Sequence, residues 1–287
     1  MPELPEVETI VRDLRPALVG RRCVAVAVGK RPLRRRWARS WNKVLVGRRI
    51  REVNRRGKWI VLALDGGCHL VIHLGMTGQL RVLGRDEPVL GHTHLVLDLH
   101  PGQSQLRFRD VRRFGSASMI ADRPGVERFF EKVGLGPEPF ELNPKYWRER
   151  LAGTVRFLKA VLLDQRVIAG VGNIYADESL FEARLHPARR GRELHPREAD
   201  RLRRALVKVL VRAIDRNGST IRDYVRGSGD EGGYQNEFRV YGRTGQPCGR
   251  CGTPIHRLRM AGRSTHFCPR CQVVKPSVGG GFREITV

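Results

Sequence analysis

The sequence predicts an α+β protein built from several domains, and three observations carry this prediction. A helical pattern of apolar residues begins almost at the N-terminus, and a long β-type stretch follows it. The second half shows further helical patterns and then a tight group of four cysteines. With 287 residues, 40% of them hydrophobic, the chain can form one large or two modest domains and a small module.

The first element is a helix. Its apolar positions recur every three or four residues, as expected for one buried helical face. They are Val7, Ile10, Val11, Leu14 and Leu18. Pro2 and Pro5 stand at the front of the pattern, where proline is tolerated, and Gly20 ends it. The helix therefore starts close to the chain terminus.

Residues 21 to 121 have β-type sequence. Short apolar runs at 23–28, 59–64, 69–73 and 94–99 are separated by glycines and charged turns. Many short strands without helices between them indicate a β-sandwich or a β-barrel. Cys23 and Cys68 lie in this stretch, and we expect both to be buried and unreactive.

Proline and glycine are concentrated at residues 134–144, which predicts a linker between domains. Beyond it we expect a helix at 154–163, a second that starts at Asn173 after a turn, and a third at 196–216. The third has a continuous apolar stripe made of Leu202, Ala205, Leu206, Val209, Leu210, Ala213 and Ile214. A polar, glycine-rich loop follows at 227–233.

The charge of the chain is extreme. Its 54 Lys and Arg residues, mostly Arg, give a net charge of +25, which favours a polyanionic partner such as nucleic acid over a surface that is basic only for solubility. The N-terminus lacks the pattern of a signal peptide, and no apolar run is long enough to span a membrane. We therefore expect a protein of the cytoplasm with no membrane partner.

The clearest chemical motif is Cys248-x2-Cys251-x16-Cys268-x2-Cys271. Two close thiolate pairs separated by a hairpin-length spacer supply four soft ligands in a tetrahedron, which suits one Zn²⁺ ion better than a pair of disulfides. Because protein ligands fill all four positions, the predicted zinc is structural. Arginines surround the motif, so this module is also a candidate DNA-binding element.

The N-terminus offers a nucleophile. Removal of Met1 would leave Pro2 with a free secondary amine, which can attack a sugar C1′ and hold the product as an iminium. The positive end of the helix dipole would lower the pKa of this amine. Glu3 and Glu6 lie within the first turn, so at least one of them could contact the same sugar of bound DNA as a proton donor. Spacing alone favours an ordinary helix start over a nucleophile, because Pro and Glu are common there.

Two further motifs could bind phosphate. Lys58 follows a glycine between β-type runs, where it could reach a phosphate, although a surface lysine is the simpler interpretation. Two glycines, Gly170 and Gly172, precede Asn173, which we interpret as a helix N-cap whose exposed N–H groups could hold a phosphate. An ordinary packing junction between helices would look the same.

Taken together, these motifs resemble the bacterial formamidopyrimidine-DNA glycosylase (Fpg/Nei) family. The stretches that carry the resemblance run through nearly the whole chain: MPELPEVETI (1–10), RRGKWI (55–60), HLGMTGQL (73–80), RDVRRFG (109–115), LLDQRVIAGVGNIYADESLF (162–181), VYGRTGQPC (240–248) and RSTHFCPRC (263–271). The family fold implies an N-terminal β-sandwich with a leading helix, a helix-two-turn-helix domain and a C-terminal zinc finger, with DNA bound in the cleft between domains.

The resemblance also implies roles for single residues. Pro2 matches the Schiff-base nucleophile and Glu3 its acid/base partner, while Lys58 matches the lysine at the scissile phosphate. Arg263 matches the arginine of the zinc finger that holds phosphates around the lesion and assists δ-elimination. Asn173 matches the phosphate-binding asparagine of the two-turn motif.

Four more positions match residues that contact the distorted duplex. His92 matches a DNA-contacting histidine, although Thr93 stands where the family often has Asp. Met76, Arg112 and Phe114 match the trio that fills the void left by a flipped nucleotide, where an apolar wedge restores packing inside the duplex once the base is extruded. Without the family, core packing would be the simpler interpretation of Met76 and Phe114.

One family position departs from the pattern. A basic DNA contact is expected just before the two-turn motif, but this place falls near Thr154. Arg156 and Lys159 lie close by and are possible substitutes.

The expected domains are a catalytic sandwich (1–133), a hinge (134–146), the helical DNA-binding domain (147–226), a lesion-capping loop (227–237), the zinc finger (238–272) and a flexible tail (273–287). The expected activity is excision of oxidised purines, chiefly 8-oxoguanine and formamidopyrimidines, followed by β,δ-elimination by a monomer acting on double-stranded DNA with oxidised bases or abasic sites. An endonuclease VIII-type enzyme for oxidised pyrimidines and a non-catalytic zinc-finger DNA-binding protein are the alternatives.

Overall fold

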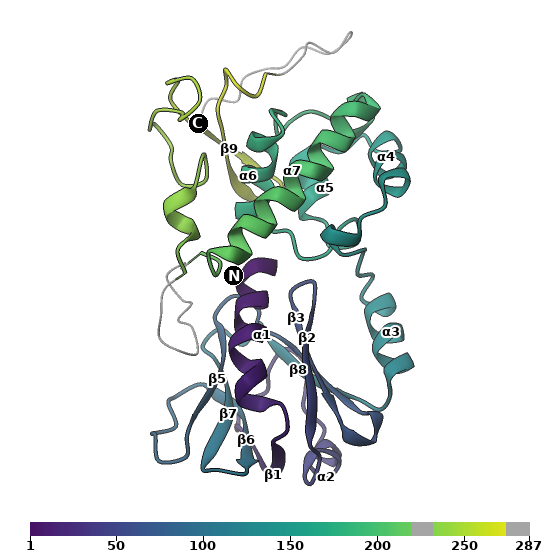
Figure 1. The fold of residues 1–287 in the computed structure, drawn as a ribbon, viewed down its shortest axis with the longest axis vertical. Coiled ribbons are helices and arrows are strands. Elements are labelled where there is room, and N and C mark those ends of the chain that lie inside the picture. Colours follow the sequence, from purple (N-terminus) through teal and green to yellow (C-terminus); the bar gives the residue numbers. More distant parts are fainter. Residues whose placement is uncertain (220–231, 274–287) are drawn as a thin grey trace. The chain divides into compact units, whose positions relative to one another are not determined.

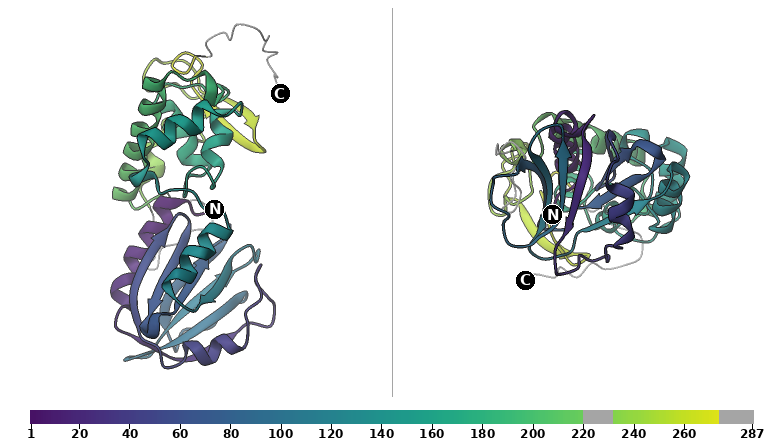
Figure 2. Two further views of the ribbon diagram at one scale, coloured as in Figure 1. Left: turned by 90° about the vertical axis from the view of Figure 1, so that its right-hand side faces the viewer. Right: turned by 90° about the horizontal axis from the view of Figure 1, so that it is seen from below.

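The computed structural model describes residues 1–219 and 232–273. The chain divides into two compact units, shown in Figures 1 and 2: Met1–Gly134 with Arg216–Gly233, and Leu135–Asp215 with Tyr234–Val287. We call them unit 1 and unit 2. The tail from residue 274 and part of the predicted lesion-capping loop, up to residue 231, lie outside the described residues.

Unit 1 begins with the predicted helix, α1 (Leu4–Leu18), for which Glu3 is the N-cap residue. Its predicted apolar face is buried: Val7, Ile10, Val11, Leu14 and Leu18 all belong to one core. Pro5 lies in the first turn, where the missing N–H costs nothing. The helix therefore starts three residues from Met1 and packs along its whole length.

Two antiparallel four-stranded sheets share that core with α1. One sheet has the order β1 (Arg22–Val28), β6 (Thr93–His100), β7 (Ser104–Asp110) and β5 (Gly78–Gly84). The other has the order β2 (Ile50–Arg56), β3 (Trp59–Leu64), β4 (His69–His73) and β8 (Ser116–Ile120). Two separate sheets around one core make a sandwich, and all four predicted runs lie in its strands.

Within unit 1 the N-terminal end of α1 and the β2–β3 turn lie at the same end, and α2 (Ser40–Leu45) lies at the opposite end (Figure 1). The predictions missed α2 and also α3 (Arg123–Lys132). The 3-10 turn η1 (Asp65–Gly67) connects β3 to β4. The N-terminus and the β2–β3 turn, which contains Lys58, thus lie at one end of the sandwich in unit 1.

Unit 2 is helical and carries a β-hairpin. It contains η2 (Pro139–Glu141), α4 (Pro144–Ala152), α5 (Leu158–Leu163), α6 (Asn173–Glu182), η3 (Gly191–Glu193), α7 (Pro196–Asp215), η4 (Tyr234–Glu237), β9 (His256–Met260) and β10 (Arg263–Phe267). The apolar stripe of α7 is buried as predicted. Trp147 of α4 is fully buried and donates from Nε1 to Ala199 O on α7 at 2.9 Å, which joins these two helices.

Two boundaries in unit 2 differ from the predictions. The first predicted helix begins at Leu158 and not at Thr154, because Phe157 pairs in extended form with Arg190. Helix α4 begins inside the predicted linker, where the Asn143 side chain accepts hydrogen bonds from the backbone of Lys145 and Tyr146. The proline and glycine content of this segment predicted a linker, but the Asn-Pro step at its end also makes a good helix N-terminus.

Candidate active site and nucleic-acid contacts

The proposed nucleophile lies just before the first turn of α1. Pro2 is buried, and the residues Glu3 and Glu6 beside it are 4% and 1% exposed, while Met1 is 41% exposed. Glu3 N donates to Glu6 Oε2 at 2.9 Å, which closes the first turn. An amine at Pro2 would therefore lie at the positive end of the helix dipole with two carboxylates close by.

Glu6 holds the end of the helix in place. Its Oε1 accepts from both the backbone N–H (2.8 Å) and the hydroxyl (2.9 Å) of Ser219. A Cβ at Gly218, where φ is +72°, would lie 3.0 Å from the same oxygen, so glycine allows this close approach. Glu6 therefore ties the chain after α7 to the N-terminus, and a direct contact of Glu6 with DNA stays a prediction.

Lys58 lies in the β2–β3 turn directly after Gly57, whose φ is +57°. It is only 6% exposed, so the simple interpretation as a surface lysine is wrong. Burial is the main cause that lowers the pKa of the neighbouring His73 to about 4, and the positive charges of Lys58, Arg34 and Arg35 contribute to the same shift. His73 is therefore neutral at physiological pH, within a site of strong positive potential.

The three residues of the expected wedge gather on two adjacent turns. Met76 is half-buried, Phe114 is 45% exposed, and the Arg112 guanidinium lies 4.7 Å from the centre of the Phe114 ring. A Cβ at Gly75 would approach the Phe114 carbonyl carbon to 2.6 Å, so the two turns are in close contact. The exposure of Phe114 rules out core packing as its role.

Asp110 is the residue that fixes these turns, and no role was predicted for it from the sequence, although it lies in the matching stretch 109–115. It is fully buried, and its carboxylate accepts from Thr77 Oγ1 at 2.6 Å and from Gly115 N at 2.7 Å. Thr77 Oγ1 in turn accepts from Arg112 N at 3.1 Å. One carboxylate thus sets the turn after Met76 and the turn that carries Arg112.

His92 joins the same network through its backbone. It has a left-handed conformation (φ +67°) and is exposed, and its carbonyl accepts from Asp110 N at 2.9 Å. Thr93, the departure from the family pattern, uses its hydroxyl to bond Leu90 O at 2.7 Å. The placement of His92 therefore depends on its backbone bond to Asp110 and needs no acidic side chain at position 93.

In unit 2, Asn173 is the first residue of α6, and the N-cap is Gly172, so the N-cap prediction was wrong by one residue. Asn173 Nδ2 donates to Ser264 O at 3.0 Å. Its buried Oδ1 has no hydrogen-bond partner within the described part of the chain. The side chain therefore links the start of α6 to the strand that begins with Arg263, which is exposed.

Lys159 cannot be the substitute DNA contact that its position suggested. Its side chain is 0% exposed, and its Nζ donates to Asp177 Oδ1 at 2.6 Å and to Asn173 O at 2.8 Å. Asp177 Oδ2 also accepts from the backbone N–H of His266 at 3.0 Å. This chain of contacts braces both Asn173 and β10. The other candidate, Arg156, is exposed and pairs with Asp164 at 2.8 Å.

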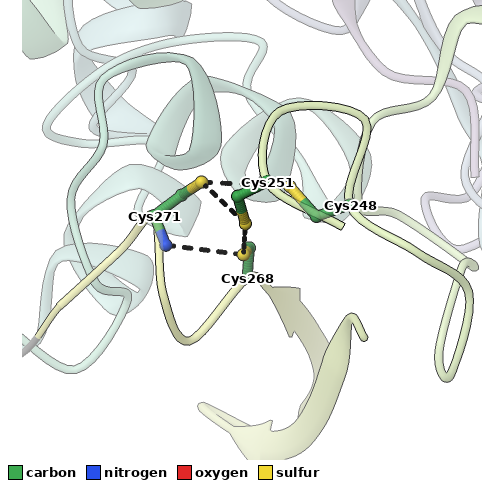
Figure 3. Close-up of side chains that lie close together, drawn as sticks. All are labelled: Cys248, Cys251, Cys268 and Cys271. Carbon is green, nitrogen blue, oxygen red and sulfur yellow. Dashed lines mark hydrogen bonds between the residues drawn. The ribbon is translucent and has the colours of Figure 1, made fainter. Parts of the chain in front are cut away.

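The four cysteines of the motif converge as Figure 3 shows, and their sulfur atoms all lie within 4.8 Å of one another. All four are free, so the disulfide alternative is wrong. Tetrahedral Zn–S bonds of about 2.3 Å require sulfurs about 3.8 Å apart. The separations here include 3.5 Å for Cys251–Cys268 and 3.9 Å for Cys248–Cys271, so the group fits one zinc ion.

The hairpin beside the cysteines carries the expected arginines, and Arg257, Arg259 and Arg263 are all exposed. The buried Glu178 of α6 is a second residue for which no role was predicted from the sequence. It accepts from three consecutive backbone N–H groups, at residues 239 to 241, over 2.8–3.1 Å. Burial raises the pKa of its carboxyl group, and these bonds oppose that shift. Cys23 is buried as expected, and burial raises the pKa of its thiol to about 12.

Comparison with known proteins covers nearly the whole chain. Residues 1–117 match the formamidopyrimidine-DNA glycosylase N-terminal domain, residues 135–225 its H2TH domain, and residues 245–273 the zinc finger found in FPG and IleRS. No helix among the described residues is long and apolar enough to cross a membrane.

Two similar curated proteins are both named formamidopyrimidine-DNA glycosylase. That of Desulforamulus reducens is 43% identical over 96% of this chain and 100% of its own, and that of Thermomicrobium roseum is 46% identical over 95% and 99%. A crystal structure of Lactococcus lactis Fpg with DNA containing an abasic site has a TM-score of 0.87 at 36% identity, covering 95% of this chain and all of that one. A structure of MutM with DNA containing carbocyclic 8-oxo-G also has a TM-score of 0.87 at 36% identity, over 94% of this chain and 99% of that one. The chain belongs to the formamidopyrimidine-DNA glycosylase family.

Proposed function

We propose that this protein is a bifunctional DNA glycosylase and AP lyase of base excision repair, which excises oxidised purines and then cleaves the strand. The observation that carries the proposal is that α1, which begins next to Pro2, Glu3 and Glu6, and the β2–β3 turn with Lys58 reach the same end of unit 1 (Figure 1). The solved relatives bound to abasic-site DNA and to 8-oxo-G DNA support this substrate class.

The chemistry follows from these groups. After removal of Met1, the neutral Pro2 amine attacks C1′ of the damaged nucleotide, and the bond from C1′ to the base breaks as the base leaves with a proton. Glu3 donates a proton to the ring oxygen as the sugar opens, which leaves an iminium between Pro2 and C1′. Loss of a C2′ proton then expels the 3′ phosphate, and a second elimination expels the 5′ phosphate.

The other predicted site residues act on the duplex. Lys58 and Arg263 neutralise phosphates at the lesion, and Asn173 and His92 bind further phosphates. Met76, Arg112 and Phe114 fill the space of the extruded nucleotide, since exposed apolar side chains on rigid turns recover some of the stacking energy. The zinc ion has a structural role, because the protein supplies all four of its ligands.

The same proposal includes a place in the bacterial cytoplasm. It also includes the domain limits given above, which are 1–133, 134–146, 147–226, 227–237, 238–272 and 273–287. Helix α3, which ends at Lys132, supports a first boundary near 133.

The deciding experiment is borohydride trapping on a duplex with 8-oxoguanine opposite cytosine, using protein whose first residue is verified as Pro2 by mass spectrometry. We expect a covalent adduct with the wild type and none with Pro2→Gly, while Pro2→Gly still binds the duplex. A full adduct with Pro2→Gly would reject the nucleophile. Absence of any adduct would favour a non-catalytic DNA-binding protein.

A second duplex tests the substrate class. Excision of 8-oxoguanine should exceed excision of thymine glycol under the same conditions. Faster excision of thymine glycol would favour the endonuclease VIII-type alternative.

A further inference from the structure

A basic loop between β1 and α2 has no role in the proposed chemistry. Five of its residues are cations and all five are exposed: Lys30, Arg31, Arg34, Arg35 and Arg36. We call residues 30–36 the basic loop. Such a density of like charge is unfavourable in isolation, because neighbouring cations repel one another.

The cations of the basic loop have no acidic partner among the described residues, whereas several arginines elsewhere in the chain do. Among residues 1–219 and 232–273, none of the five forms an ion pair with a carboxylate. Elsewhere Arg12 pairs with Glu8 at 3.2 Å, and Arg148 pairs with Asp200 at 2.9 Å. The charge of the basic loop is therefore not compensated within the described protein.

The backbone of the basic loop is fixed next to the proposed wedge. Arg34 N donates to Gly115 O at 3.2 Å, directly after Phe114. The carbonyl of Arg31 lies 3.2 Å from Nδ1 of the buried His94, whose other ring nitrogen lies 2.9 Å from Asp110 O. The loop thus joins the same network that fixes the wedge turns.

A third anchor lies beside Lys58. The Arg35 guanidinium is 4.8 Å from the centre of the Phe129 ring and 6.0 Å from that of Trp59, the residue after Lys58. Arg34 and Arg35 also act on His73, whose pKa they help to lower. The basic loop therefore lies between the lysine turn and the wedge, with its remaining cations exposed to a ligand.

We infer that the basic loop is an additional phosphate-binding surface, on which Lys30, Arg31, Arg34 and Arg36 contact the DNA backbone next to the phosphates held by Lys58. Arg35 holds the loop on Trp59 and Phe129. This inference rests on the proposed function for its partner, duplex DNA. Because backbone contacts carry no base information, the basic loop adds affinity for damaged and undamaged duplex alike.

The test compares two variants with the same loss of charge. Arg31→Gln/Arg34→Gln/Arg36→Gln removes three cations of the basic loop. Arg22→Gln/Lys43→Gln/Arg51→Gln removes three exposed cations elsewhere in unit 1. Arg22 is the first residue of β1, a strand about 20 Å long, and the basic loop follows the other end of that strand. Lys43 lies on α2, at the end of the sandwich opposite the N-terminal end of α1 (Figure 1).

The readout is the salt dependence of binding to an undamaged duplex. Each phosphate contact that is removed reduces the slope of log K against log salt concentration by about 0.9. We expect the slope to decrease by about 2–3 for the basic-loop variant and by less than about 1 for the control variant. Equal slopes for the two variants would overturn the inference. Thermal unfolding of both verifies that they remain folded.

A second measurement separates this inference from the proposed function. With enzyme in excess at low salt, borohydride trapping on the 8-oxoguanine duplex should proceed at the wild-type rate in the basic-loop variant. A loss of trapping under saturation would overturn the inference by showing that the loop acts in the chemistry. If wild-type protein forms no adduct, the proposed activity fails, while the slopes still decide whether the basic loop binds DNA.

Discussion

The buried ion pair between Lys159 and Asp177 allows the sharpest prediction, made with Lys159→Met. Methionine keeps most of the length of the side chain and removes the charge. In the native protein both side chains are 0% exposed and 2.6 Å apart, and Lys159 also bonds the carbonyl of Asn173. The substitution removes the hydrogen bond from Lys159 to Asp177. Asp177 then remains as a buried carboxylate beside His266.

The expected cost is large, since removing one partner of a buried pair strands the other charge. Such losses are about 3–5 kcal/mol in the free energy of unfolding. Lys208→Met is the matched control within unit 2, because Lys208 pairs with Glu182 but its side chain is 57% exposed. A surface pair of this kind contributes about 0–1 kcal/mol. The double variant Lys159→Met/Asp177→Asn should regain part of the loss, because no charge is then stranded.

Urea unfolding followed by circular dichroism measures these free energies, and the salt slope of DNA binding measures phosphate contacts. We expect Lys159→Met to lower stability several-fold more than Lys208→Met and to leave the slope unchanged where the variant is folded. A slope reduced by about 0.9 with unchanged stability would mean that Lys159 is a phosphate contact. That result would refute the reasoning.

Other parts of the structure allow three further predictions. Asp110→Ala strands the N–H of Gly115 and the hydroxyl of Thr77, so we expect a loss of about 2–4 kcal/mol in urea unfolding; a loss no greater than that of Val111→Ala, at an exposed neighbour, would contradict the role of Asp110. His73 has a pKa of about 4 in the folded protein, against 6.5 ordinarily, so the unfolded chain binds a proton at a higher pH than the folded chain does. The free energy of unfolding should therefore fall as the pH drops from about 6.5 to about 4, by up to about 1.4 kcal/mol per pH unit. His73→Gln should lack this part of the pH dependence, and an unchanged profile would show that His73 does not cause it. Zinc chelation should weaken DNA binding and raise the rate of amide hydrogen exchange in β9 and β10, while the rate in the sandwich stays unchanged. Equal exchange rates in β9 and β10 with and without the chelator would argue against the zinc site.

Four of the eight strands of the sandwich could be predicted from the sequence because they carry short apolar runs between glycines and charged turns. These runs fitted a sandwich or a barrel, and the family resemblance favoured the sandwich. The helix α1 and the stripe of α7 were equally clear, because one buried face leaves a strong helical period. Helix α2 is short, and only Leu45 of its six residues is buried. Helix α3 buries only Phe130, so its sequence lacks a wide apolar face.

The site was predicted less completely, for a physical reason. Pro2, Lys58 and the cysteines belong to local motifs, but Asp110 and Glu178 act on backbone groups that are distant in sequence. The sequence shows that these residues are charged but not that they are buried. Lys159 illustrates the same limit, since its partner Asp177 lies 18 residues away and only the fold brings them together.

Helix α6 has a consequence for moving the zinc module to another protein. Asp177 bonds the backbone of β10, and Glu178 bonds three consecutive N–H groups just before the first cysteine pair. The buried Phe181 of the same helix packs with Cys248 and Cys268 in one small core. Residues 238–272 transferred alone to another protein would therefore lose these contacts with α6. A transfer that keeps them must include α6 as well.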